Sequence, residues 1–172
     1  MIEIYKNIYV GDEHSYYSIF DKEDWGILHC CKHPFHCQFV GYSGNLPSSH
    51  KDYALKRKDN EMALNLVDMH FFSENYLGIN KDMFEQAFYF LDEYYKDGKS
   101  IYIHCNEGKS RSPSLGMLYM ARLGGFDYAD FETSLEKFKK IYPTYEPKKN
   151  IFETVKRLWD YFVKEELCKN NL

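Results

Sequence analysis

The first half of the chain alternates short apolar runs with polar turns, a pattern typical of buried strands. Residues 7–10 (NIYV) predict a short strand, and residues 25–31 (WGILHCC) predict a second, mostly buried one. Residues 62–67 (MALNLV) predict a third strand that leads directly into Asp68. Between these strands, residues 41–60 hold glycine, proline, serine and the charged cluster KRKDN, so we expect a loop there.

From Asn80 onwards the apolar spacing becomes helical. Apolar side chains recur three and four positions apart as far as Tyr95, with Asn80 as the predicted cap and Gly98 as the predicted stop. A strand at residues 100–104 and a helix at residues 112–123 follow. Two more helices are expected, at residues 128–141 and 151–166. This order of elements predicts an α/β layer fold, and the lack of repeats and linkers predicts one domain over residues 1–172.

Composition and charge narrow the function without naming it. The chain carries a net charge of −4, so no general positive field would attract nucleic acid or an anionic membrane. Its apolar runs are too short for a membrane span, so we expect no insertion into a membrane. No secretory signal is visible, so we expect a cytoplasmic protein. We also expect the protein to act as a monomer. The five cysteines are not spaced like a disulfide framework, which predicts thiols.

The segment with the most chemical information is residues 103–112 (IHCNEGKSRS), between a predicted strand and a predicted helix. The N-terminus of a helix presents unpaired N–H groups and a partial positive charge, so a loop at this place can bind a phosphate. Gly108 allows the backbone to turn tightly. The same field favours thiolate over thiol at Cys105, which makes this side chain the predicted nucleophile.

The other residues of this loop have predicted supporting roles. Arg111 is expected to fold over the phosphate, because its planar guanidinium matches two phosphate oxygens. We expect Ser112 to offer its hydroxyl to the sulfur and His104 to act as a scaffold that hydrogen-bonds the loop. The predicted phosphate-binding residues, in addition to Arg111, are Asn106, Glu107, Gly108, Lys109 and Ser110.

Phosphoryl transfer also needs an acid that protonates the leaving oxygen. Asp68 is the predicted acid, because it ends a strand and opens a loop at residues 69–80 that we expect to be mobile. Glu74 and Asp82 are weaker candidates, since one lies within that loop and the other falls in the first turn of a helix.

These residues resemble a known family. The segment HCNEGKSRSPS is similar to the signature loop of the dual-specificity protein phosphatases, a branch of the cysteine-based protein tyrosine phosphatases. The runs NIYVGD, WGILHCC, LNLVD, FEQAFYFLDEYYKDG and YPTYEPKKNIFETV also resemble segments of that family, so nearly the whole chain is covered.

The resemblance implies a central mixed sheet of about five strands flanked by helices, and a two-step hydrolysis that needs no metal or other cofactor. Cys105 would attack phosphorus while Asp68 protonates the leaving oxygen, and water would then hydrolyse the cysteinyl-phosphate. The implied partner is a protein phosphorylated on tyrosine, serine or threonine. Lys109 is less typical of the family and leaves phosphoinositides or inositol phosphates as the alternative substrate. A phosphate-binding module without activity is the competing class, although such modules usually lack the cysteine, the arginine or the acid.

Some tempting signals have plainer explanations. The histidines and cysteines at residues 29–37 match no common zinc-site spacing, so we expect no metal there. The basic run at residues 56–58 reads as a solvated loop. Cys168 reads as an incidental exposed thiol near the polar end of the chain.

Overall fold

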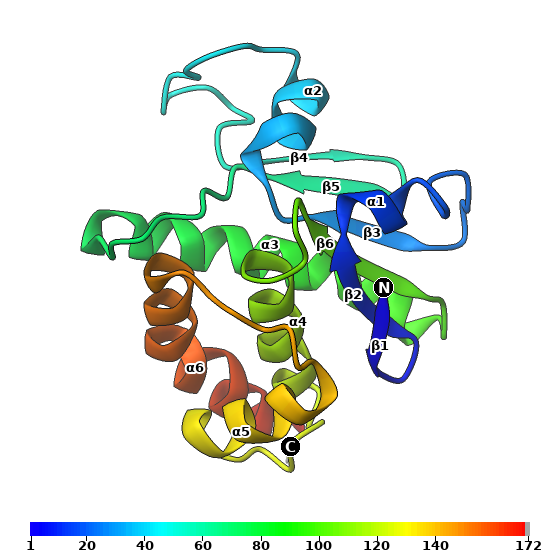
Figure 1. The fold of residues 1–172 in the computed structure, drawn as a ribbon, viewed down its shortest axis with the longest axis vertical. Coiled ribbons are helices and arrows are strands. Elements are labelled where there is room, and N and C mark those ends of the chain that lie inside the picture. Colours follow the sequence, from blue (N-terminus) through cyan, green and yellow to red (C-terminus); the bar gives the residue numbers. More distant parts are fainter. Residues whose placement is uncertain (171–172) are drawn as a thin grey trace.

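Within the described residues, short and mostly buried apolar segments form the central strands of one six-stranded sheet, with helices on both faces (Figure 1). The computed structural model describes residues 1–170 and the side chains of residues 1–164, so the side chain of Cys168 lies outside the described part. The strand order is β1-β2-β6-β3-β5-β4. The strands are Ile2–Tyr5 (β1), Ile8–Asp12 (β2), Gly26–His29 (β3), Leu55–Lys58 (β4), Glu61–Leu64 (β5) and Ile101–Cys105 (β6).

The direction of the strands differs between the centre and the edges of the sheet. Strands β2, β6, β3 and β5 run parallel, whereas the edge strands β1 and β4 pair antiparallel with β2 and β5. The parallel strands are buried on both faces, as crossover connections usually require. Their carboxyl ends therefore meet at one edge, where loops can bring distant residues together.

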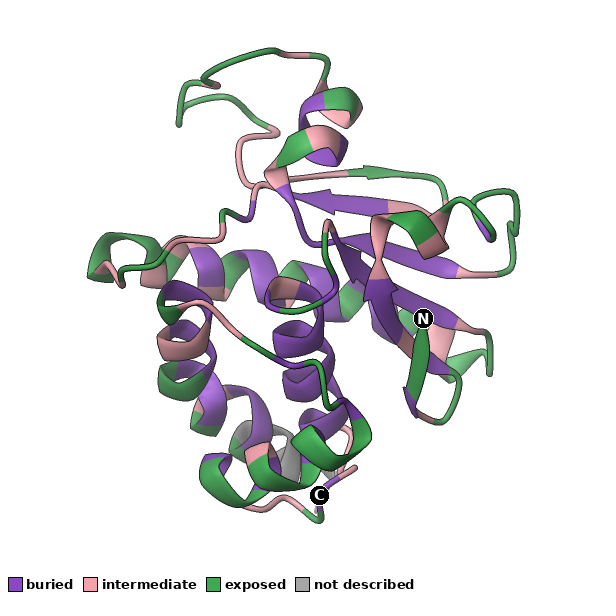
Figure 2. Cartoon of the chain, in the orientation of Figure 1, coloured by how far each residue is buried: buried purple, intermediate pink, exposed green. Residues whose placement is uncertain are grey.

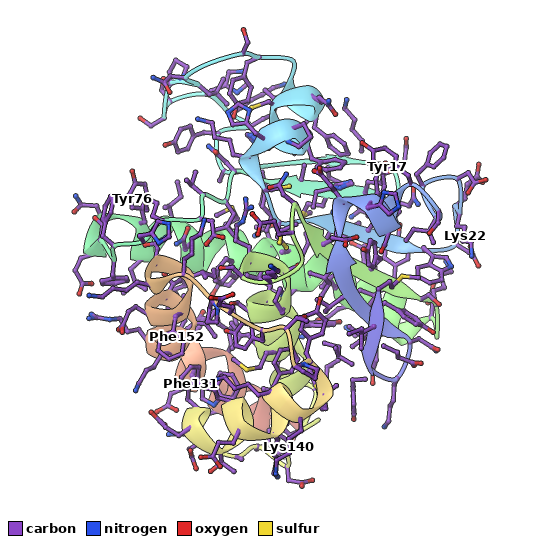
Figure 3. The ribbon with its side chains drawn as sticks, viewed as in Figure 1. Tyr17, Lys22, Tyr76, Phe131, Lys140 and Phe152 are labelled. Atoms are coloured by element: carbon purple, nitrogen blue, oxygen red, sulfur yellow. The ribbon has the colours of Figure 1, made fainter. Side chains whose placement is uncertain are left out.

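Six helices complete the fold in the described part of the chain. They are Glu13–Tyr16 (α1), Cys37–Val40 (α2), Leu77–Lys96 (α3), Arg111–Arg122 (α4), Phe131–Ile141 (α5) and Lys149–Asn170 (α6), with further helical turns at Lys32–His36 and Glu74–Tyr76. The main core lies between the sheet and the long helices, and Figure 2 shows buried residues concentrated on the central strands and on α4. Aromatic rings join α5 to α6, where Phe131 contacts Phe152 at a centroid distance of 5.5 Å (Figure 3).

Successive side chains of strand β6 point to opposite faces of the sheet and pack in different hydrophobic clusters. Ile101, Ile103 and Cys105 join the main core, whereas Tyr102 packs with Ile19 in a smaller cluster on the opposite face. This follows from the two-residue period of a strand. None of the helices in the described part is long and apolar enough to cross a membrane.

The structure confirms the α/β fold and most of the predicted elements, with several corrections. The sheet has six strands, in keeping with the mixed sheet of about five that the resemblance implies. The apolar pattern predicts four of them and misses two, because β1 was not predicted and residues 41–60 are not entirely loop. Residues Leu55–Lys58 of that region form β4, which pairs with β5 at the edge of the sheet. Its three consecutive basic residues, at positions 56–58, are typical of an edge strand exposed to solvent.

The predicted boundaries of the helices also need correction. The expected loop at residues 69–80 contains a helical turn and the start of α3, which begins at Leu77. Asn80 does not cap α3, because it lies within the helix and is buried. The helix ends as predicted before Gly98, whose φ is 68°. Helix α5 begins at Phe131 instead of residue 128, because the Asp130 side chain accepts a hydrogen bond from the Thr133 N–H and caps it.

Candidate active site

The predicted loop lies where the sequence places it, between the end of β6 and the start of α4. Cys105 is the last residue of β6 and Arg111 is the first residue of α4. Gly108, at the tip, has a φ of 68°. A Cβ atom at this position would lie 2.9 Å from the carbonyl carbon of Gly11 and 3.0 Å from its oxygen. Position 108 therefore requires glycine for its torsion and for its close approach to β2.

Hydrogen bonds from the surrounding structure hold the loop by its carbonyl groups. The carbonyl of Asn106 accepts from the Glu13 N–H, and that of Lys109 accepts from the Glu146 N–H at 2.8 Å. The Gly108 carbonyl accepts from the Tyr142 hydroxyl at 2.8 Å. No hydrogen bond between described residues uses the backbone N–H groups of residues 106–110. These N–H groups and the start of α4 thus form a binding site suited to an anion.

Cys105 lies at the base of this loop and is 1% exposed. The Ser112 hydroxyl is 3.2 Å from the Cys105 sulfur and 2.9 Å from the Gly11 carbonyl oxygen. A hydroxyl has one proton, so Ser112 can donate to the sulfur when the sulfur is negatively charged and to Gly11 otherwise. Two other thiols lie nearby, and burial raises the pKa of Cys31 to about 12 and raises the pKa of Cys30 as well.

The guanidinium of Arg111 is held in place but keeps one donor available. Its Nη2 donates to Asn106 Oδ1 at 2.7 Å, and its Nη1 donates to the Leu66 carbonyl at 3.3 Å. Its Nε is buried and has no hydrogen-bond partner among the described residues. Since buried donors are nearly always satisfied in folded proteins, this N–H group is well suited to an oxygen of a bound anion.

The structure places Asp68 beside Arg111. Its Oδ2 is 3.7 Å from Arg111 Nε and 3.8 Å from Lys148 Nζ, and its Oδ1 accepts from the Ser110 hydroxyl at 2.8 Å. The same hydroxyl oxygen accepts from the Lys148 N–H at 3.0 Å. The signature loop, the segment after β5 and the segment before α6 therefore meet at this carboxylate.

The weaker acid candidates do not belong to this site. Glu74 forms an exposed ion pair with Arg157, and Asp82 lies in α3. Neither of them lines the cavity that contains Cys105.

His104 supports the loop differently from the prediction. Its ring stacks on Tyr16 and Tyr102, and its Nε2 lies 2.5 Å from His29 Nδ1 instead of bonding the loop. His29 Nε2 in turn lies 2.6 Å from a carboxylate oxygen of Glu61. Burial lowers the pKa of His104 well below its ordinary value, and the nearby His29 lowers it further. Both imidazoles are therefore best described as neutral. The His104 Nε2–H then donates to His29 Nδ1, and the His29 Nε2–H donates to the Glu61 carboxylate.

A cavity of about 420 Å³ opens above Cys105. It is lined by charged and polar side chains from the three segments that meet at Asp68: Asp68, His70, Cys105, Glu107, Lys109, Ser110, Arg111, Glu146, Pro147, Lys148 and Lys149. Lys109 and Glu107 are exposed at its rim. Lys148 and Lys149 were not predicted from the sequence as site residues. Their position directly after a proline-containing loop was the signal that could have identified them.

The histidines and cysteines at residues 29–37 separate into different environments. Cys37 Sγ lies 3.2 Å from His33 Nδ1, whereas His36 hydrogen-bonds Tyr42 and the Asp52 carbonyl. Within the described side chains, no three His, Cys, Asp or Glu residues form a group that could hold a metal ion.

Part of this chain is similar in sequence to a curated protein. The curated protein-tyrosine-phosphatase IBR5 of Arabidopsis thaliana is 30% identical over an alignment of 96 residues, which covers 52% of this chain and 37% of that protein. The chain thus matches little more than a third of that relative's length.

Solved structures share the fold at lower identity. The crystal structure of DUSP15 superposes with a TM-score of 0.66 at 15% identity and covers 99% of this chain and 95% of that chain. The crystal structure of PTPMT1 in complex with PI(5)P gives a TM-score of 0.55 at 18% identity and covers 95% of this chain and 91% of that chain.

The family model "Dual specificity phosphatase, catalytic domain" matches residues 42–156, well over half of the 172 residues. The match includes Asp68 and the complete signature loop. The chain therefore belongs to the dual specificity phosphatase family.

Proposed function

We propose that this chain hydrolyses phosphate esters of tyrosine, serine and threonine in proteins through a cysteinyl-phosphate on Cys105. The observation that carries the proposal is the arrangement around the sulfur. Cys105 lies within a loop whose backbone N–H groups are unused among the described residues, and it is next to the hydroxyl of Ser112. Arg111 presents a buried Nε–H that has no hydrogen-bond partner in the same part of the chain and lies 3.7 Å from Asp68 Oδ2. Such a site stabilises a phosphoryl group by charge and by position, which are the main requirements of phosphoryl transfer.

In the first step, the sulfur of Cys105 forms a bond to phosphorus while the bond between phosphorus and the leaving oxygen breaks. The loop N–H groups and Arg111 bind the three equatorial oxygens, where negative charge is spread in the transition state. Asp68 gives its proton to the leaving oxygen. Its position beside Arg111, with Ser110 holding one carboxylate oxygen, supports this role.

In the second step, a water oxygen forms a bond to phosphorus and the sulfur–phosphorus bond breaks. Asp68, now ionised, accepts a proton from the water. The Ser112 hydroxyl donates its proton in a hydrogen bond to the departing thiolate, at the 3.2 Å separation observed. Inorganic phosphate then leaves and Asp68 carries a proton again.

A second substrate class is supported by the lysines of the cavity. Lys109 is exposed at the rim, and Lys148 and Lys149 line the same cavity, so a second phosphate could be neutralised there. The fold neighbour PTPMT1 was crystallised with PI(5)P, which makes a phosphoinositide or inositol phosphate the alternative to a phosphoprotein. We rank it second, because Asp68, Glu107 and Glu146 oppose these cations in the same cavity.

We also propose that residues 1–172 act as one catalytic domain, as a monomer in the cytoplasm. Strands β2 and β3 lie outside the matched residues 42–156 but pair with β6, which carries Cys105. The four cysteines with described side chains are all unpaired, as expected of a reducing compartment.

The test is hydrolysis of an aryl phosphate by the purified protein in the presence of a chelator. The wild type and the control variant Cys37→Ser should be active, whereas Cys105→Ser should be inactive. Activity that survives Cys105→Ser, or that requires a divalent ion, would overturn the proposal. Phosphotyrosine and phosphothreonine peptides compared with phosphoinositides then identify the substrate class, and Lys109→Gln should weaken only the phosphoinositide reaction if that alternative holds.

A further inference from the structure

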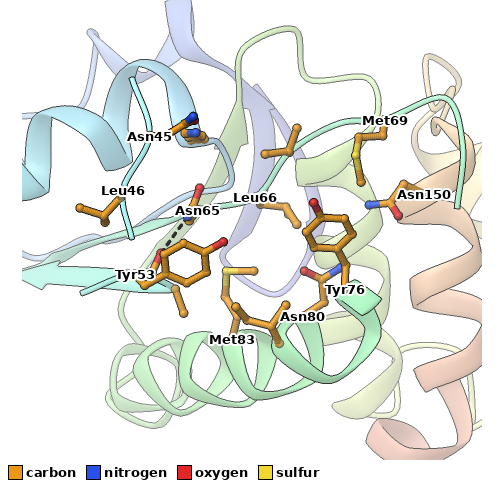
Figure 4. A pocket seen from close by; sticks show the side chains of 14 residues that line it. Asn45, Leu46, Tyr53, Asn65, Leu66, Met69, Tyr76, Asn80, Met83 and Asn150 are labelled. Atoms are coloured by element: carbon orange, nitrogen blue, oxygen red, sulfur yellow. Dashed lines mark hydrogen bonds between the residues drawn. The ribbon is translucent and has the colours of Figure 1, made fainter. Parts of the chain in front are cut away.

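A second cavity, of about 300 Å³, lies next to the segment that carries Asp68. Its lining residues come from the helical turns at Lys32–His36 and Glu74–Tyr76, residues 45–54, residues 65–69, the first half of α3 and the start of α6 (Figure 4). It shares no lining residue with the cavity above Cys105. Its volume is at the lower end of the range for small-molecule sites, about 300–1,000 Å³. The cavity is therefore large enough for a compact organic ligand.

The lining combines apolar walls with a single charge. Leu46, Tyr53, Leu66 and Met83 contribute hydrophobic surface. Lys32 is the only Lys, Arg, Asp or Glu residue that lines this cavity. It is half-buried and forms no ion pair within the described side chains. Because no carboxylate balances this lysine, the cavity favours a ligand that carries negative charge.

Two buried amides in the lining have unused hydrogen-bonding atoms. Asn80 is 4% exposed and Asn150 is 2% exposed. Asn80 Nδ2 and Asn150 Oδ1 have no partner in the part of the chain that is described. By contrast, Asn65 in the same lining donates to the Tyr53 carbonyl at 2.8 Å, the dashed line in Figure 4. A buried donor or acceptor without a partner is costly, so a ligand with polar groups would stabilise this end of the cavity.

We propose that this cavity binds a small amphipathic anion, with an aromatic or branched apolar body and one negatively charged group near Lys32. The site is separate from the phosphatase chemistry, and the proposal does not depend on that chemistry. Val67 and Met69 line the cavity on either side of Asp68 in the sequence, so a bound ligand contacts the backbone segment that positions this carboxylate.

The probe for the experiment is 1-anilinonaphthalene-8-sulfonate, which combines aromatic rings with one sulfonate. Its fluorescence is titrated with the intact protein in saturating inorganic phosphate, which blocks the anion site at Cys105. We expect saturable binding at one site. Ala54→Phe, which places a ring in the cavity, should weaken binding by at least about tenfold. Lys32→Gln should weaken it about two- to fivefold, the effect of one partly exposed ion pair, and the control Lys139→Gln on α5 should leave it unchanged.

The location of the probe is measured by NMR of the wild-type protein with 13C-labelled methionine methyl groups. Met69 and Met83 line the cavity, so their signals should shift on titration, whereas Met1 and Met117 should not. Displacement of the probe by phosphate, unaltered binding to Ala54→Phe, or unshifted signals of Met69 and Met83 would each overturn the proposal. The NMR measurement decides the question even if Ala54→Phe fails to fold.

Discussion

Gly108 and Gly98 offer a matched pair of substitutions, because they share a backbone torsion and differ in their surroundings. Both have a φ of 68°. A Cβ atom at position 98 would find nothing within 4 Å, whereas one at position 108 would lie 2.9 Å from the carbonyl carbon of Gly11. The variants Gly98→Ala and Gly108→Ala therefore separate the cost of the torsion from the cost of the collision.

The expected magnitudes follow from these contacts. Each alanine in the left-handed region should cost about 1–2 kcal/mol of stability. At Gly108 the loop must also move away from β2, and ordinary contact begins at 3.4 Å. A movement of about 0.5 Å is thus required. Since a misplacement of about 1 Å can reduce catalysis about 100-fold, we expect kcat/KM to fall at least about tenfold in Gly108→Ala.

Three measurements on both variants test this reasoning: urea denaturation, binding of inorganic phosphate, and kcat/KM with an aryl phosphate. Gly98→Ala should lose stability but keep phosphate affinity and activity. Gly108→Ala should lose all three. If Gly108→Ala binds phosphate as tightly as the wild type, the close approach of the loop to β2 does not shape the anion site, and the explanation is wrong.

Three further predictions concern the acid, a buried imidazole and a buried carboxylate. Asp68→Asn should slow hydrolysis of phosphothreonine about 10²–10⁴-fold but barely slow that of a dinitrophenyl phosphate, whose leaving oxygen needs no proton. Equal losses for both substrates would point to another acid. Burial lowers the pKa of His104, so below about pH 6.5 the unfolded state binds a proton that the folded state does not. Stability should then fall by up to about 1.4 kcal/mol per pH unit as the pH decreases, and urea denaturation at several pH values should show a smaller slope in His104→Gln. Asp92→Ala removes a buried carboxylate that accepts three hydrogen bonds, and it should lower the free energy of unfolding by about 3 kcal/mol or more. Glu93→Ala removes only an exposed ion pair and should lower it by less than about 1 kcal/mol. Similar losses of stability for both variants in thermal unfolding would refute this difference.

The central strands and the signature loop were predictable because their signals are local. Apolar runs bounded by turn residues identify β3 and β6, and the loop from Cys105 to Arg111 is contiguous in sequence. Asp68 was also predictable, although it is distant in sequence, because the end of a parallel strand places it at the same edge of the sheet as Cys105.

The missed features depend on contacts between distant residues. Strand β4 has the sequence LKRK, which resembles a solvated loop until β5 pairs with it and Glu93 pairs with Arg57. The start of α3 lacks a side-chain cap, so no sequence signal marks Leu77. The hydrogen bond between His104 and His29 joins residues on adjacent strands that only the strand register brings together.

The residue that is phosphorylated during turnover tests the role of Cys105 most directly. The protein is mixed with an aryl phosphate, denatured within milliseconds, digested and analysed by mass spectrometry. The peptide containing Cys105 should carry one phosphoryl group, and the corresponding peptide of Cys105→Ser, which lacks the thiol nucleophile, should carry none. A phosphoryl group on another residue, or steady turnover without any phosphorylated protein, would contradict the claim that Cys105 takes the phosphoryl group.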